Sequence, residues 1–310
     1  MRVLVVSHYF WPEGFRINQV VEDLIAAGAD VTVLTGHPSY PEGHTFPGYD
    51  ARTTRKQLHP AGYPIFRVPV VPRGDGGAVR LLLNYVSFVV TGILCGTWLL
   101  RGRKFDTVFV YANSPVIQGY VGVWFKWIKR ARLVQWIQDL WPQALSATGF
   151  IKSPAALSIV RKAIAFMYHR SDLILGQSHA FVDYIRKDAG KVPVEFFPNP
   201  GEHAPPPGAE AVVKLPAGKF NVVFGGNLGK VQAMETVVAA ADLLRDQPDI
   251  HFTLFGSGSM AEWIQNAVAT RKLTNFTMGG RQPSEAMANI FAQASALLLT
   301  LVDDLLLSQT

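Results

Sequence analysis

Short apolar runs rich in β-branched residues alternate with helix-length amphipathic stretches along most of this chain. In the first two hundred residues the runs are Val3–Ser7, Asp30–Thr35, Ile65–Val71, Thr107–Tyr111, Leu133–Gln138, Leu173–Gly176 and Val194–Phe197. Between them lie the helical patterns Asn18–Ala27, Val79–Leu100, Val116–Lys129, Ala155–His169 and His179–Asp188. Strands that are apolar throughout and separated by helices are typical of a parallel sheet covered on both faces. The pattern predicts a doubly wound α/β domain over residues 1–200.

Prolines and glycines then interrupt the alternation, which predicts a linker over residues 201–217. The alternation restarts with the apolar runs Phe220–Phe224, Ile250–Phe255, Phe276–Met278 and Ala296–Leu301 and the helical patterns Met234–Leu244, Met260–Thr270 and Ser284–Ala292. Residues 218–310 are therefore predicted to form a second Rossmann-like domain. We expect ligands at the carboxyl ends of the strands, in a cleft between the two domains.

Composition narrows the classes of protein. The 310 residues are 49% apolar and 17% charged and include a single cysteine, Cys95, which excludes bulk disorder and an internal disulfide framework. Residues 1–200 hold 22 Lys and Arg against 13 Asp and Glu, whereas residues 201–310 hold 7 against 10. The basic first half permits an anionic partner, either nucleic acid or a membrane surface. The charge is spread over the domain, so we expect no nucleic-acid binding.

Leu81–Leu100 has no charged residue, and Arg80 and Arg101 bound it. Its length is sufficient for a transmembrane helix. A span would, however, separate the apolar run that follows it from Val3–Ser7, although both are predicted in one sheet. A core helix and a helix lying in the membrane interface both remain open, and the arginine flanks suit the second.

The loops after the strands carry the candidate ligand residues of the first domain. The loop from His8 to Asn18 lacks Gly-x-Gly-x-x-Gly, which argues against a dinucleotide cofactor. Its aromatic and charged residues either pack beneath the loop or bind a sugar or polar lipid. Asp139, beside Trp141, could bind a sugar hydroxyl or accept a proton, and the alternative is a turn residue. Ser114 is expected to cap the next helix.

Two glycine-rich loops follow neighbouring strands of the second domain. The first is Gly225-Gly-Asn-Leu-Gly-Lys230, and the second is Gly256-Ser-Gly-Ser259. Glycines allow a close approach of the backbone to phosphate, and Lys230 supplies a cation. Together the loops predict a nucleotide-diphosphate site. A Walker A ending is missing, and no His, Cys, Asp or Glu set has metal-ligand spacing.

The motifs resemble those of GT-B glycosyltransferases, specifically the retaining family 4 group and its colanic-acid and O-antigen fucosamine-transferase-like subgroup. The matching segments are Tyr9-Phe-Trp-Pro-Glu-Gly-Phe-Arg-Ile-Asn18, Thr35-Gly-His-Pro-Ser-Tyr-Pro-Glu-Gly43, Gln138-Asp-Leu-Trp-Pro142, Phe197-Pro-Asn-Pro200 and Gly226-Asn-Leu-Gly-Lys-Val-Gln232 with Glu235.

This resemblance implies transfer of a sugar from a nucleotide-diphosphate donor, expected to be UDP-linked, to a lipid-linked or saccharide acceptor in bacterial surface-polysaccharide synthesis. It implies no cofactor and no bound metal, with the enzyme in the cytoplasm, peripheral at the inner face of the plasma membrane. Asp139 would be catalytic. The donor would contact Gly226, Asn227, Lys230, Gln232, Gly256 and Gly258. Glu13, Gly14, Arg16, Asn18 and His37 would form the diphosphate and acceptor loop.

The sequence departs from the family pattern in two places. Asn227 and Gln232 occupy positions where many members have the Arg and Lys that hold the diphosphate. The Glu-x7-Glu segment of the donor domain is expected after Ala296–Leu301, but no glutamate follows Glu285. We therefore expect a truncated second domain and weak or no transfer by this chain. The alternative is a non-catalytic protein that binds a sugar nucleotide or an anionic lipid.

Overall fold

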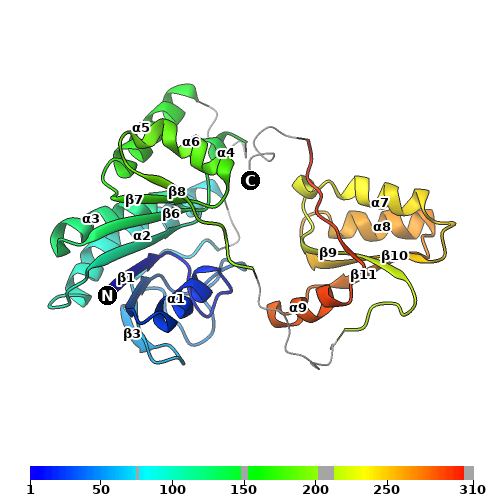
Figure 1. Ribbon diagram of the computed structural model, residues 1–310, viewed down its shortest axis with the longest axis horizontal. Coiled ribbons are helices and arrows are strands. Elements are labelled where there is room, and N and C mark those ends of the chain that lie inside the picture. Colours follow the sequence, from blue (N-terminus) through cyan, green and yellow to red (C-terminus); the bar gives the residue numbers. More distant parts are fainter. Residues whose placement is uncertain (75–76, 148–152, 202–212, 304–310) are drawn as a thin grey trace. The chain divides into compact units, whose positions relative to one another are not determined.

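The computed structural model describes residues 1–74, 77–147, 153–201 and 213–303. The chain divides into two compact units, Met1–Pro200 and Gly201–Ser308, and each is built on a sheet of its own (Figure 1). The predicted α/β class is confirmed for both units.

The sheet of the first unit has eight strands in the order β3-β4-β2-β1-β5-β6-β7-β8. The strands are β1 (Arg2–Ser7), β2 (Asp30–Thr35), β3 (Arg55–Leu58), β4 (Pro64–Arg67), β5 (Thr107–Ala112), β6 (Arg132–Ile137), β7 (Leu173–Gly176) and β8 (Val194–Phe196). All neighbours are parallel except β3 and β4. The apolar pattern missed β3 because this short edge strand is polar and mostly exposed.

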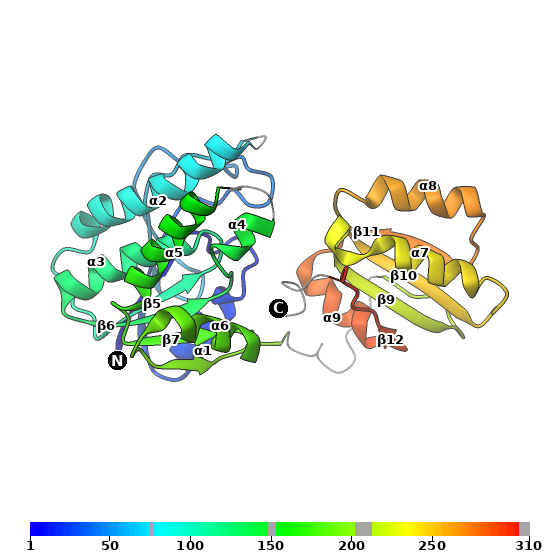
Figure 2. The same cartoon turned by 90° about the horizontal axis from the view of Figure 1, so that it is seen from above.

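Helices cover both faces of this sheet. They are α1 (Ile17–Ala26), α2 (Ala78–Leu99), α3 (Gly119–Lys129), α4 (Gln143–Ala147), α5 (Pro154–Tyr168) and α6 (His179–Ala189), with a 3-10 turn, η1, at Val116–Gln118. Leu4 and Val6 of β1 point into the core beneath α2, α3 and α5, whereas Val3 and Val5 point into the core beneath α1. Figure 2 shows α2, α3 and α5 together on one face and α1 on the other.

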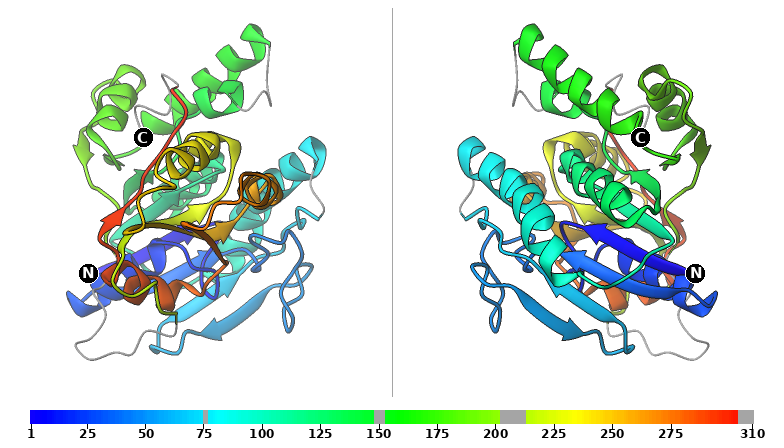
Figure 3. Two further views of the ribbon diagram at one scale, coloured as in Figure 1. Left: turned by 90° about the vertical axis from the view of Figure 1, so that its right-hand side faces the viewer. Right: turned by 90° about the vertical axis from the view of Figure 1, so that its left-hand side faces the viewer.

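The long apolar helix α2 packs against α3, and Figure 3 (right) shows the two side by side. By length and composition α2 could cross a membrane, and only 22% of its most apolar window is buried. The strands before and after it, β4 and β5, belong to one sheet, so α2 is an integral layer of the first unit. The helix predicted at Leu81–Leu100 contributes Tyr85 and Phe88 to the core of the first unit and exposes its other face, so both interpretations, a core helix and an interfacial helix, stay open.

The second unit has four parallel strands in the order β11-β10-β9-β12. They are β9 (Phe220–Asn227), β10 (Ile250–Ser257), β11 (Phe276–Gly280) and β12 (Ala296–Leu297), and the last is shorter than predicted. The helices are α7 (Met234–Leu243), α8 (Ala261–Arg271) and α9 (Ser284–Ala292), with the 3-10 turn η2 at Lys230–Gln232. One core lies beneath α7 and α8, and a second lies beneath α9.

Candidate functional site

The carboxyl ends of β1 and β5 lie side by side where the strand order of the first sheet reverses. The chain leaves β1 toward β2 on one side, and α2 later carries it to β5 on the other side. Open α/β sheets bind ligands outside the strands at such a point. The loops that follow β1, β2, β5 and β6 therefore form the candidate site of the first unit.

Glu13 joins the loop after β1 to the loop after β2. Its side chain is buried and accepts hydrogen bonds from the backbone N–H groups of Phe10 (3.1 Å), Ser39 (2.8 Å) and Tyr40 (2.7 Å). Both carboxylate oxygens are therefore bonded to the backbone. In this structure Glu13 fixes the shape of the site.

Arg67, at the end of β4, is fully buried beneath the same loops. Its guanidinium donates hydrogen bonds to the carbonyls of Trp11 and Gly36 and to Oε1 of Gln57, and it lies 5.0 Å from the ring centroid of Tyr49. Burial lowers the pKa of Arg67 to about 10, so the group is still charged at neutral pH. Two buried ionisable groups thus hold these loops.

Burial raises the pKa of Glu13 to about 7, against the opposing effect of its backbone hydrogen bonds and of Arg67. Below this value the folded protein keeps a proton that the unfolded chain has released above pH 4.5. The stabilisation therefore decreases as pH rises from about 4.5 to 7. We expect the stability of the wild type relative to Glu13→Gln to fall by about 3 kcal/mol between pH 4.5 and 8.

Urea unfolding followed by tryptophan fluorescence measures this difference, because six of the seven tryptophans lie in the first unit. Glu22→Gln on the exposed side of α1 is the matched control. The same pH slope in both variants would contradict the assignment to Glu13.

The other residues predicted on these loops have separate roles. Asn18 accepts from the N–H of Trp11 (3.1 Å) and donates to the carbonyl of Glu13 (2.6 Å), so it also shapes the first loop. Nε2 of buried His37 lies 2.9 Å from the carbonyl of Thr53, and burial lowers the pKa of His37. Because a carbonyl only accepts, Nε2 carries the proton.

Gly14 and Arg16 complete the predicted set. Gly14 is exposed, and Arg16 is half-buried at the residue before α1. The structure therefore brings Glu13 and Asn18 together, whereas the imidazole of His37 bonds to Thr53 on another segment.

Arg73 is a candidate that no sequence motif indicated. The carbon centre of its guanidinium lies 5.1 Å from the ring centroid of Tyr9, 5.7 Å from that of Tyr40 and 5.6 Å from that of Tyr85. Its NH2 lies 3.4 Å from the hydroxyl of Tyr85, and its Nε is buried without a hydrogen-bond partner among the described residues. A cation held among three aromatic rings is suited to an anionic ligand.

Asp139 lies close to this cluster. Its Oδ2 accepts hydrogen bonds from the hydroxyl of Ser114 (2.8 Å) and from the indole N–H of Trp141 (3.3 Å). Burial raises the pKa of Asp139, and these bonds oppose the shift. The N-cap predicted for Ser114 is wrong, because its hydroxyl bonds to Asp139 and Pro115 precedes η1. A half-buried carboxylate of this kind suits contact with a hydroxyl or transfer of a proton.

In the second unit the two glycine-rich segments are the paired ends of neighbouring strands. Gly225, Gly226 and Asn227 of β9 are in register with Phe255, Gly256 and Ser257 of β10. Both strands are longer than the sequence predicts, because the glycines continue the pairing. The predicted neighbours Gly226 and Gly256 thus meet directly.

Close backbone packing explains the glycines. Gly256 has φ +142°, and a Cβ there would lie 1.8 Å from the carbonyl oxygen of Gly226. A Cβ on Gly258 would lie 2.5 Å from the carbonyl oxygen of Leu228. Ser259 does not cap α8, which begins at Ala261 without a side-chain cap. The strand ends consequently present exposed backbone at Gly226 and half-buried backbone at Gly256.

The segment that follows β9 forms a short turn before the helix. Oε1 of Gln232 accepts from the N–H of Gly229 (3.2 Å) and from Nδ2 of Asn227 (3.4 Å), and Thr300 donates to the carbonyl of Gln232 (2.7 Å). Lys230 is exposed on η2, and α7 begins only at Met234. Asn227 and Gln232 are therefore brought together, with Lys230 on the same turn.

In the described part of the chain, no group of three or more His, Cys, Asp or Glu side chains could hold a metal ion. The only charged side chain on the turn formed by η2 is that of Lys230.

The family profile described as a glycosyl transferase 4-like domain matches residues 14–200. The chain belongs to this glycosyltransferase family. A relative named colanic acid biosynthesis glycosyl transferase WcaI, from Escherichia coli strain K12, is 26% identical over 304 residues, covering 93% of this chain and 73% of WcaI.

Solved structures show the fold of this glycosyltransferase. The UDP complex of Anabaena HepE has a TM-score of 0.58 at 12% identity, covering 96% of this chain and 73% of HepE. A UDP-forming trehalose-phosphate synthase from Burkholderia xenovorans has a TM-score of 0.66 at 11% identity, covering 97% of this chain and 80% of the synthase. The fold class is GT-B, with two Rossmann-like parallel sheets.

Proposed function

We propose that this glycosyltransferase transfers a sugar from a UDP-linked donor to a lipid-linked or saccharide acceptor in the synthesis of bacterial surface polysaccharide. The reaction would retain the anomeric configuration and need no bound metal, at the inner face of the plasma membrane. The observation that carries the proposal is the pair of bare glycine strand ends, Gly226 beside Gly256, on a glycosyltransferase fold.

The donor diphosphate would lie at these strand ends. Backbone without side chains permits phosphate to approach closely, and Lys230 on the adjoining turn supplies a positive charge. The side-chain amides of Asn227 and Gln232 bond to each other, which places both of them on the turn beside Lys230. HepE, which shares the fold, was solved with UDP, and this supports the choice of nucleotide.

The acceptor would lie at the loops of the first unit. Arg73 among its tyrosines suits a phosphate of a lipid-linked acceptor. Asp139 would accept a hydrogen bond from the attacking hydroxyl and orient it on the face of the donor sugar that UDP leaves, and the departing phosphate would take the proton, as retention in one step requires. Glu13, Asn18 and His37 would maintain the loop shape around the acceptor.

The exposed face of α2 would contact the membrane. The side chains of Leu82, Leu83, Val86, Val90 and Leu94 are between 42% and 66% exposed. They are spaced at helical intervals on one side of an uncharged segment that arginines bound. Such a helix lies in the interface of an anionic bilayer.

Calorimetric titration with UDP in the presence of EDTA tests the donor site. We expect binding, and we expect Lys230→Ala to weaken it about tenfold, because a hydrogen bond to a charged group contributes about 1.5 kcal/mol. Lys219→Ala is the matched control, since Lys219 is an exposed lysine at the other end of β9. Equal losses in both variants would contradict a diphosphate at η2.

A transfer assay with UDP-sugars distinguishes the enzyme from the alternative, a non-catalytic sugar-nucleotide or anionic-lipid binding protein. Because weak or no transfer is expected from this chain, the assay is also run on a chain extended by a donor-domain segment with the Glu-x7-Glu motif. UDP binding without transfer by both chains would support that alternative.

A further inference from the structure

A cavity of about 870 Å³ opens on the first unit, away from the loops described above. Residues of α2, of α3 and its end, and of the turn after α5 line it, and they include Ile93, Trp124, Lys126, Trp127, Arg130 and Arg170. Most of these residues lie where α3 and α5 end, before β6 and β7 begin. The cavity, called here the α3 groove, is therefore near the amino-terminal edge of the sheet, opposite the proposed acceptor loops.

The walls of the α3 groove are aromatic. Trp124 is anchored by a hydrogen bond from its indole N–H to the hydroxyl of Thr97 on α2 (2.8 Å). The ring of Trp127 lies 5.4 Å from that of Trp124, and Trp127 is 71% exposed. Tryptophan combines an apolar ring with a polar N–H, which favours the boundary between lipid and water.

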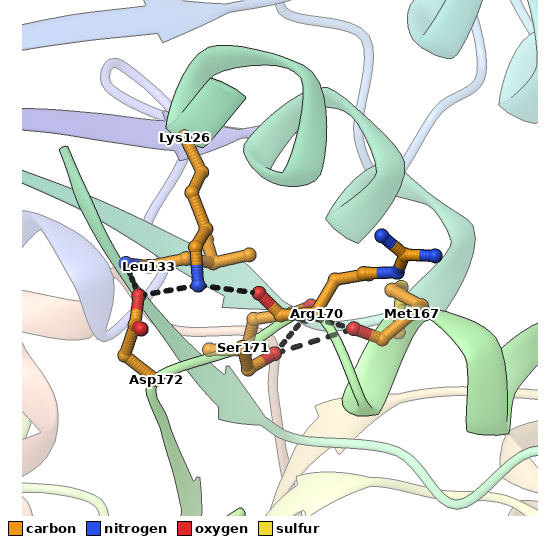
Figure 4. A network of polar contacts seen from close by, with 7 residues as sticks. Lys126, Leu133, Met167, Arg170, Ser171 and Asp172 are labelled. Carbon is orange, nitrogen blue, oxygen red and sulfur yellow. Dashed lines mark hydrogen bonds and ion pairs between the residues drawn. The ribbon is translucent and has the colours of Figure 1, made fainter. Parts of the chain in front are cut away.

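The charged residues that line the α3 groove are all cations, and they are not equivalent. Lys126 is paired with Asp172 (2.7 Å) and donates to the carbonyl of Arg170 (2.8 Å), so its charge is largely compensated. Figure 4 shows the Lys126 ammonium between the Asp172 carboxylate and the Arg170 carbonyl, while the Arg170 guanidinium points away. That guanidinium lies 4.7 Å from the ring of Phe166. Arg170 and exposed Arg130 thus leave the groove with a net positive charge.

The α3 groove continues an exposed apolar surface. Leu94 and Trp98 of α2 are 66% and 58% exposed, and Ile93 of the same helical turn lines the groove. The guanidinium of Arg101 stacks 4.7 Å from Trp98, which adds a further cation at this end of α2. Apolar residues, tryptophans and arginines on one face match the chemistry of an anionic bilayer surface.

We propose that the α3 groove binds an anionic phospholipid of the membrane. Arg130 and Arg170 bind the phosphate, and Trp124 and Trp127 pack against the glycerol and the first carbons of the acyl chains. Arginine suits this role because its planar fork of donors matches phosphate oxygens. The inference rests on the proposed membrane contact of α2, which brings lipid to the groove.

Vesicle flotation tests lipid binding in the groove. One vesicle preparation contains phosphatidylcholine alone, and the other contains about 30% phosphatidylglycerol. We expect the wild type to bind the anionic vesicles at least tenfold more tightly than the neutral ones. Arg130→Gln combined with Arg170→Gln should lower binding to the anionic vesicles at least fivefold and leave binding to the neutral ones unchanged. Lys187→Gln combined with Lys191→Gln removes the same charge from two exposed lysines, one in the last turn of α6 and one just after it. This control should change binding to either vesicle composition by less than twofold.

The outcomes separate the two proposals. If both double variants lose affinity equally, the effect is general electrostatics and the groove proposal is overturned while the α2 contact stands. Leu83→Asp with Val90→Asp should abolish binding to both vesicles. If the wild type bound neither vesicle composition, both proposals would fail. If the wild type then self-associated and the α2 variant did not, a second copy of the chain would be the partner of the exposed α2 face.

A soluble short-chain phosphatidylglycerol below its micelle concentration, followed by tryptophan fluorescence, is a second test. We expect saturable quenching that Trp127→Ala reduces, whereas inorganic phosphate at the same concentration gives none. Equal responses to phosphate and lipid would overturn the lipid assignment.

Discussion

Replacing Gly256 with alanine is expected to weaken UDP binding at least a hundredfold. The new Cβ would lie 1.8 Å from the carbonyl oxygen of Gly226, and φ at this position is +142°. The ends of β9 and β10 must separate to accommodate it, which moves the backbone that would face the diphosphate. A hundredfold change corresponds to about 2.7 kcal/mol.

Two companion variants make this result specific. Gly226→Ala adds a methyl group 3.5 Å from the nearest carbon of Phe224, without backbone strain, and should preserve folding while reducing UDP affinity. Ser259→Ala changes an exposed side chain beside the strand end and should bind as the wild type does. Trp263 on α8, the single tryptophan of the second unit, reports whether that unit remains folded. A Gly256→Ala chain that binds UDP within threefold of the wild type would refute the proposed position.

The second large effect is expected for Arg67→Met. The substitution keeps an apolar stem but leaves the buried carbonyls of Trp11 and Gly36 without their donor and removes the positive charge near Glu13. Breaking a buried charged network of this kind costs about 3–5 kcal/mol. Urea unfolding followed by tryptophan fluorescence should register this loss in the first unit.

Arg55→Met is a closely matched control. The guanidinium of Arg55 also lies 5.0 Å from the ring centroid of Tyr49, but Arg55 is exposed and donates to the carbonyl of Gly48 (2.8 Å) on a neighbouring exposed loop. We expect a loss of no more than about 1 kcal/mol. Similar losses for both arginines would show that burial of Arg67 is not the cause.

Alternation of apolar strands and helices was sufficient to predict the fold class, because the central parallel strands β1, β2 and β5 are buried on both faces. The predicted strand boundaries were wrong where strand formation depends on pairing with distant residues rather than on the local sequence. Arg55–Leu58 is a polar strand that depends on its pairing with β4, and the ends of β9 and β10 contain glycines that disfavour strands in isolation. His8 and Trp11, in contrast, pack beneath their loop in agreement with one of the two expected interpretations.

The candidate site was predicted less completely than the fold. Glu13 and Asp139 were indicated by their positions after strands, but the reason for their environments lies in distant partners. Ser39 is 26 residues from Glu13, and Ser114 is 25 residues from Asp139. Arg73 precedes a helix in an unremarkable segment, and its three tyrosines converge only after the sheet has formed. A single sequence carries no signal for such convergence.

The direction of α2 has a consequence for how an acceptor reaches the enzyme. The helix begins beside the Arg73 cluster and ends near the α3 groove, and its 22 residues extend about 33 Å. If α2 lay flat on a bilayer, its whole length would contact the headgroups, and the acceptor loops at its first end would lie beside the membrane surface. A membrane-embedded carrier could then present its phosphate sideways, with its hydrocarbon tail still in the bilayer, and the enzyme would not have to extract it.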